Sequence, residues 1–159
     1  MATRPKKSWQ EKLADDKDLP KVLKIAPAHR ARFGGNTLAI PAPREIDALM
    51  RSVPKGQVTT INELRSAVAK RHRAAAGCPI TTGIFSWVAP HAAEEARAAG
   101  EPNPTPYWRT LKTGGELNPK YPGGVEAVRE RLAAEGHTFG LKGSRVVVTN
   151  LAQVLSSPQ

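Results

Sequence analysis

The chain has 159 residues and carries 24 Lys and Arg against 14 Asp and Glu, which gives a formal net charge of +10. This length suits one domain with a buried core. The positive charge indicates an anionic partner, and nucleic acid is the first candidate. A single cysteine excludes an intramolecular disulfide framework and a cysteine-rich zinc site, and we expect neither a metal nor a cofactor.

The sequence also argues against a membrane partner. No apolar run approaches the 18 residues of a membrane span, and the basic amino terminus lacks the apolar core of a secretory signal. We therefore expect a monomeric, cytoplasmic protein, associated with the nucleoid if the source is bacterial.

Residues 1–40 form a basic N-terminal extension, with nine Lys or Arg against four acidic residues and several Pro and Gly interruptions. We expect a short helix near Trp9 to Ala14 and otherwise irregular, partly docked chain. The extension is either a solubilising tail or an arm that touches nucleic acid, and the sequence leaves both alternatives open.

A helix is predicted from Pro43, because proline suits the first helical turn. Its apolar residues recur with helical spacing and predict a face packed on the core: Ile46, Leu49, Met50 and Val53. The segment Pro54-Lys55-Gly56 should end this helix.

The next helix has a capping signal at its start, since the Thr60 hydroxyl can accept from the Glu63 amide while the glutamate reaches back. Ile61, Leu64 and Val68 give it an apolar face. Its far end is basic, because it carries Arg65, Lys70, Arg71 and Arg73 and no acidic residue lies between them.

A short linker containing Gly77 leads to Cys78-Pro79 and a second helix that begins at Ile80. Helix, short turn and helix is the arrangement of a helix-turn-helix. Pro90 should kink the second helix or start a new one, with Gly100 as the stop.

The remainder predicts a loop over 101–106, a last amphipathic helix carrying Val125, Val128 and Leu132, and a β-hairpin over Phe139 to Asn150. The expected fold class is therefore α/β, mostly helical with a small hairpin. We divide the chain into the extension 1–40, a domain at 41–137, and a hairpin and tail at 138–159.

Three separated motifs suggest a family. They are Val53-Pro54-Lys55-Gly56-Gln57-Val58-Thr59-Thr60, then Thr105-Pro106-Tyr107-Trp108-Arg109, then Tyr121-Pro122-Gly123-Gly124 with a helix closing at Glu135-Gly136. In this order they resemble the DNA-binding and active-site domain of the alkylguanine-DNA alkyltransferases, over roughly Ile40 to His137. That family carries Pro-Cys-His-Arg where this chain has Pro106-Tyr107-Trp108-Arg109.

The resemblance implies a winged-helix-like helix-turn-helix domain that binds double-stranded DNA, places its second helix in the minor groove and rotates a nucleotide into a pocket. The implied DNA contacts are Thr60, Ile61, Arg65, Arg71, Arg73, Ile80, Thr81, Thr82, Gly83 and Arg109. The implied base pocket consists of Tyr107, Trp108, Tyr121, Gly123 and Gly124.

Departures from the family pattern bear on the mechanism. Ile61 follows Thr60 where the family usually has a tyrosine, and Ile80 aligns with the arginine that family members insert into the base stack. An apolar wedge can fill such a gap. Tyr107 replaces the alkyl-accepting cysteine, and alkyl transfer needs an activated thiolate.

We therefore expect a non-catalytic sensor of alkylated or distorted bases, akin to the cysteine-less alkyltransferase-like proteins, which leaves repair to downstream proteins. One alternative is a repair enzyme, either a base-excising hydrolase using His91, Glu94, Glu95 or Tyr107, or an alkyl acceptor at Cys78 before a helix start. Another alternative is an architectural DNA binder. The two aromatic residues at 107 and 108 could also simply pack in the core.

Overall fold

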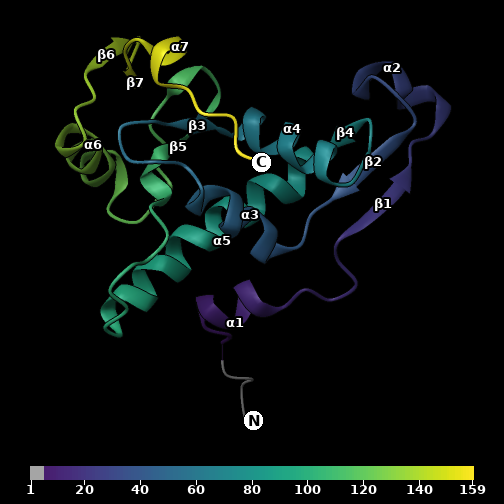
Figure 1. The fold of residues 1–159 in the computed structure, drawn as a ribbon, viewed down its shortest axis with the longest axis horizontal. Helices are drawn as coiled ribbons and strands as arrows, with labels where there is room; N and C mark the ends of the chain where they lie inside the picture. The colour runs from purple at the N-terminus through teal and green to yellow at the C-terminus, as the bar shows by residue number, and fades with distance from the viewer. Residues whose placement is uncertain (1–5) are drawn as a thin grey trace.

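The helix α5 (Pro79–Ala98) runs through the middle of the molecule and packs against three other helices (Figure 1). The structure is a computed structural model, and it describes residues 6–159. No helix in the part of the chain that it describes is long and apolar enough to cross a membrane.

The core lies where α3 (Pro43–Arg51) and α4 (Ile61–Arg71) pack on α5. The stripe predicted for α3 is confirmed, because Ile46, Leu49 and Met50 are fully buried and Val53 is 1% exposed. Pro43 occupies the first turn of α3, as expected. In α4, Leu64 and Val68 are fully buried, whereas Ile61 is half-buried at the surface of the core.

The predicted N-cap of α4 is also confirmed. Thr60 is extended, and its hydroxyl accepts a hydrogen bond from the Glu63 amide at 3.4 Å. This bond satisfies one of the amides that a helix start leaves without an intrahelical partner. The short strand β3 (Thr59–Thr60) that leads into the cap pairs in parallel with β5 (Thr110–Leu111).

We expect Thr60→Ala to lower the free energy of unfolding by about 1 kcal/mol, because the substitution removes the capping oxygen. Urea unfolding of the purified variant measures this loss. Thr60→Ser, which keeps the hydroxyl and loses only a methyl group, is the matched control and should retain most of the stability. Equal losses in the two variants would contradict the role of the cap.

The N-terminal segment has more structure than the sequence suggested. The predicted helix is confirmed as α1 (Trp9–Ala14), but the irregular chain expected after it is wrong. That part contains β1 (Lys21–Lys24), the 3-10 turn η1 (Pro27–His29), the short helix α2 (Arg30–Phe33) and β2 (Thr37–Ile40).

Long-range pairing explains this difference. Strand β2 pairs antiparallel with β1 and parallel with β4 (Ala76–Gly77), so β2 becomes a central strand only when the α4–α5 linker is beside it. The segment 21–40 is therefore joined to the helix-turn-helix by β2, and α1 packs on α5. The division into three parts stays a prediction.

Of the two alternatives predicted for α5 at Pro90, a kink or a new helix, the new helix is excluded. Helix α5 continues as a single helix through the buried Pro90 instead of starting a second one there. It ends at Ala98, and Gly100 follows with a φ of +97°, as expected for a stop.

The C-terminal part follows the predicted order. The turns η2 (Tyr107–Arg109) and η3 (Thr113–Gly115) precede α6 (Gly124–Ala134). The predicted hairpin is confirmed as β6 (Phe139–Lys142) and β7 (Arg145–Val148), followed by α7 (Leu151–Val154). The expected α/β class, mostly helical with a small hairpin, is confirmed.

Candidate nucleic-acid interface

Helices α4 and α5 and the short turn between them form the predicted helix-turn-helix. The turn needs a glycine, because a Cβ on Gly77 would collide with the carbonyl oxygen of Arg65. The Arg65 guanidinium in turn donates from Nε to the Gly77 carbonyl at 3.2 Å, so it fixes the turn. The sequence folds this way locally because α4 and its linker approach each other closely at that glycine.

The predicted basic cluster at the end of α4 is only partly free for an anionic partner. Arg65 holds the turn, and Arg71 lies 3.6 Å from Glu45 and also donates to the Gln159 carbonyl. Lys70 and Arg73 are exposed, and neither has a carboxylate within ion-pair distance among the residues described. The remaining positive charge is therefore concentrated at the last turn of α4.

The first half of α5 exposes an apolar stripe. Ile80 is 71% exposed, Ile84 49% and Trp87 41%, and their spacing places them on one face of the helix. Large apolar side chains at this exposure in one row indicate a contact surface rather than scattered surface residues. Gly83 lies exposed within the same stretch, so the helix surface is open there to close approach.

The other two predicted groove residues do not share this face. Thr82 is fully buried, and the prediction that it contacts DNA is therefore corrected: its side chain belongs to the interior of α5. Thr81 is half-buried. The helical period explains this difference. Each residue of a helix is rotated by about 100° from the one before it, so Thr81 and Thr82 do not point in the direction of Ile80.

A cavity of about 930 Å³ lies beside this stripe, and we name it the α5 cavity. Its apolar wall consists of Ile61, Ile80, Gly83, Ile84 and Trp87. The opposite side comes from the loop before α6 and carries Lys112, Asn118 and Lys120, with Ser86 and His91 also on the lining. The cavity thus combines an aromatic and aliphatic wall with cationic and amide groups.

His91 is half-buried at one end of the cavity. Its ring stacks on Trp9 with centroids 4.5 Å apart and meets Trp87 edge-on at 5.2 Å. Burial lowers the pKa of His91 below its ordinary value; a hydrogen bond with the Lys120 backbone opposes this effect, and the charge of Lys12 adds to it. At neutral pH the cavity therefore presents a neutral imidazole.

This pKa gives a pH dependence with a definite sign. In the unfolded chain the imidazole takes up a proton at a higher pH than it does in the fold, so the unfolded state binds more protons as the pH falls. Stability should therefore decrease from pH 7 to about pH 5, and His91→Gln should reduce that decrease. Urea unfolding at the two pH values tests this, and an identical decrease in both proteins would contradict it.

The aromatic residues of the predicted base pocket lie in the core. Tyr107 is 2% exposed and Tyr121 3%, and their rings meet edge-on at 5.5 Å. Trp108 is half-buried and packs edge-on against Tyr107. None of the three lines the α5 cavity. The predicted glycines serve the start of α6, where Gly123 and Gly124 have φ values of +80° and +72°.

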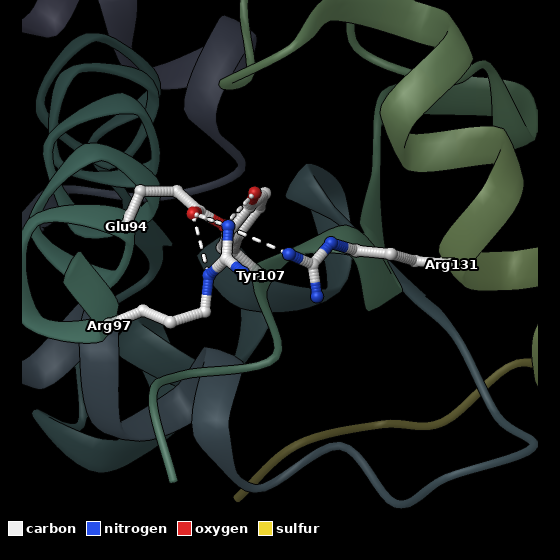
Figure 2. A network of polar contacts seen from close by, with 4 residues as sticks. All are labelled: Glu94, Arg97, Tyr107 and Arg131. Atoms are coloured by element: carbon white, nitrogen blue, oxygen red, sulfur yellow. Dashed lines mark hydrogen bonds and ion pairs between the residues drawn. The ribbon is translucent and has the colours of Figure 1, made fainter. Parts of the chain in front are cut away.

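Tyr107 belongs to a polar network centred on Glu94 (Figure 2). The Tyr107 hydroxyl donates to Glu94 Oε1 at 2.7 Å, and Arg131 donates to the same oxygen at 3.2 Å. Arg97 donates to Glu94 Oε2 from Nε at 2.9 Å and from Nη2 at 2.6 Å. Burial, and then the bond to Glu94, raise the pKa of the Tyr107 phenol far above its ordinary value.

The carboxylates proposed for a hydrolase are engaged in contacts that do not include His91. Burial alone would raise the pKa of Glu94, but the hydrogen bonds from Tyr107 and Arg97 outweigh it and the pKa is lowered. Glu95 accepts the backbone amides of Trp9 and Gln10, each at 3.0 Å. Both carboxylates are thus already engaged, and His91 makes no hydrogen bond to either of them among the described contacts.

Cys78 and Arg109 occupy structural positions. Cys78 is the N-cap residue of α5 and is 7% exposed. Arg109, expected at the DNA, forms an ion pair with Glu135 at 2.6 Å and donates to the Val53 carbonyl at 2.8 Å. Among the residues described, no group of three His, Cys, Asp or Glu side chains could hold a metal ion.

Sequence reasoning assigned several residues of the cavity to no site, among them Trp87, Lys112, Asn118 and Lys120. Trp87 carried a signal, because it follows Ile80 and Ile84 with helical spacing, but the pattern does not say whether such a face is buried. The other three come from loop positions, where no periodicity exists.

No family model matches the sequence, and no curated protein matches it. Among solved structures, the chain is similar to the crystal structure of S. pombe Atl1 in complex with damaged DNA containing O6-carboxymethylguanine, with a TM-score of 0.52 and 17% sequence identity. The similarity covers 73% of this chain and 94% of the Atl1 chain. The chain therefore has the fold of Atl1, which confirms the fold expected from the sequence motifs.

Proposed function

We propose that the protein binds double-stranded DNA through α4 and α5 and accepts an alkylated or otherwise distorted base in the α5 cavity, without altering the DNA chemically. The observation that carries the proposal is the exposed stripe of Ile80, Ile84 and Trp87, which forms the apolar wall of that cavity. The net charge of +10 supports a polyanionic partner. The fold likeness adds support, since Atl1 was solved with damaged DNA.

The chemistry of the cavity suits an extruded nucleotide. Base stacking on aromatic side chains contributes about 1–3 kcal/mol per base and tolerates any base, and Trp87 supplies such a surface. Lys120 would meet phosphate oxygens, and so would Lys112 in exchange for its ion pair with Glu116 at 3.8 Å. The Asn118 amide can both donate and accept hydrogen bonds. Ile80 would serve as the apolar wedge that takes the place of the extruded base.

The environment of Tyr107 supports the absence of catalysis in this proposal. A nucleophile at that position would have to be a phenolate, but burial and the hydrogen bond to Glu94 keep the phenol protonated. The hydroxyl is also committed as a donor to Glu94, in a core that Tyr121 shares. Repair would then depend on a second protein that recognises the complex.

The deciding experiment compares two matched duplexes, one with a single O6-alkylguanine and one without, at about 50 and 200 mM salt. We expect tighter binding to the modified duplex, no change in the mass of DNA or protein, and a steep loss of affinity with salt. Release of a base would establish an excising enzyme, and an alkylated Cys78 would establish transfer chemistry. Equal affinity for both duplexes would leave a general architectural binder.

A further inference from the structure

The N-terminal helix α1 is fastened to α5 by directed hydrogen bonds. The Glu95 carboxylate accepts the backbone amides of Trp9 and Gln10, one on each oxygen, and the Gln10 side chain donates to the Ala92 carbonyl. Ser8 caps α1 from its own side by accepting the Glu11 amide at 3.1 Å. A tail that only improves solubility would not need a glutamate of another helix to accept hydrogen bonds from its first two helical amides.

This attachment brings Trp9 onto the wall of the α5 cavity. The indole stacks on His91 with an interplanar angle of 22° and meets Trp87 at 4.8 Å and 89°. Trp87 and His91 both line the cavity, whereas Trp9 does not. Trp9 therefore contacts two residues of the lining without being part of it.

We propose that Trp9 is a positioning residue, which holds the rings of Trp87 and His91 in place so that the α5 cavity can stack on an inserted base. The inference rests on the proposed function and assigns a role in it to the N-terminal helix. Aromatic pairs prefer edge-to-face or offset-stacked arrangements, and Trp9 makes one contact of each kind. Without Trp9, Trp87 would gain rotamer freedom, which it would have to lose on binding.

The test compares Trp9→Ala and Trp9→Phe with the unaltered protein, using the duplex that carries a single O6-alkylguanine and its unmodified twin. We expect Trp9→Ala to weaken binding of the modified duplex about tenfold, because two aromatic contacts to the wall are lost. The unmodified duplex should bind within about twofold, since it makes phosphate and groove contacts only. Trp9→Phe, which keeps a stacking ring, should recover most of the lost affinity.

Glu11→Ala is the matched control, since Glu11 is an exposed residue of the same helix, and it should bind like the unaltered protein. Equal weakening for both duplexes, or unchanged affinity for the modified one, would overturn the positioning role. Tighter binding by Trp9→Ala would also overturn it, because the helix would then be a cover that the DNA displaces.

A second readout needs no DNA. Removing the indole opens the His91 ring to water, so its titration, followed by NMR, should move up toward the ordinary histidine range in Trp9→Ala and should stay low in Trp9→Phe. An unchanged titration in Trp9→Ala would overturn the claim that Trp9 holds this wall. If the unaltered protein does not distinguish the two duplexes, the proposed function fails, and the titration still decides whether Trp9 positions His91.

Discussion

Replacing Glu135 with alanine is expected to lower the free energy of unfolding by about 3–5 kcal/mol, the largest effect of any substitution considered for this protein. Glu135 is the carboxylate partner of Arg109, and the two side chains are 8% and 13% exposed. Arg109 donates to both Glu135 oxygens and to the Val53 carbonyl. Without Glu135 the guanidinium would remain buried with no counter-charge, which costs far more than a surface ion pair contributes.

Urea unfolding of Glu135→Ala at neutral pH measures the loss. Glu130→Ala provides the control, because Glu130 is exposed on α6 and should change stability by less than about 0.5 kcal/mol. The double variant Arg109→Met with Glu135→Leu should recover much of the stability, since both charges are then absent. If the single and double variants were equally unstable, lost packing rather than the unpaired charge would be the cause.

The second large effect is expected on DNA binding. Ile80→Asp should reduce affinity for duplex DNA on the order of 100-fold, because the substitution would place a negative charge against the phosphates and remove the side chain proposed as the apolar wedge. Stability should change little, since Ile80 is 71% exposed. Titration of a labelled duplex by fluorescence anisotropy gives the affinity.

The chain offers a close control for charge. Leu141→Asp changes the net charge equally, at a side chain that is 75% exposed on β6 of the hairpin. It should weaken DNA binding only slightly, because it lowers the net charge of the protein by one unit without touching the α5 stripe. A similar loss in the two aspartate variants would refute a specific role for the α5 stripe.

Local patterns predicted the local structure well. The apolar spacing in α3, the capping threonine of α4 and the glycine-centred hairpin each depend on residues a few positions apart, and each is confirmed. The strands β1 and β2 depend on a different kind of information. Leu38 pairs with Ala76, and no short window of sequence contains both partners.

The candidate site shows the same limit. Sequence motifs located the helix-turn-helix, which supplies the apolar wall of the α5 cavity, but not the loop residues before α6 that complete its lining. They could not show that Tyr107 turns inward to Glu94, because that depends on where a carboxylate thirteen residues earlier points. Nor could they show that Lys112 and Lys120 line the same cavity, because the two lysines belong to a stretch without helical or strand periodicity.

The link between Trp9 and Glu95 has a consequence for the synthesis of the chain. The two residues are 86 positions apart, so α1 leaves the ribosome long before its acceptor exists. At about 5–20 residues per second, translation needs roughly 4–17 s to cover that interval. A six-residue helix is not stable alone in water, so the segment stays unfolded during this time and docks only once α5 has formed. The aromatic wall therefore cannot assemble before α5 has been synthesised.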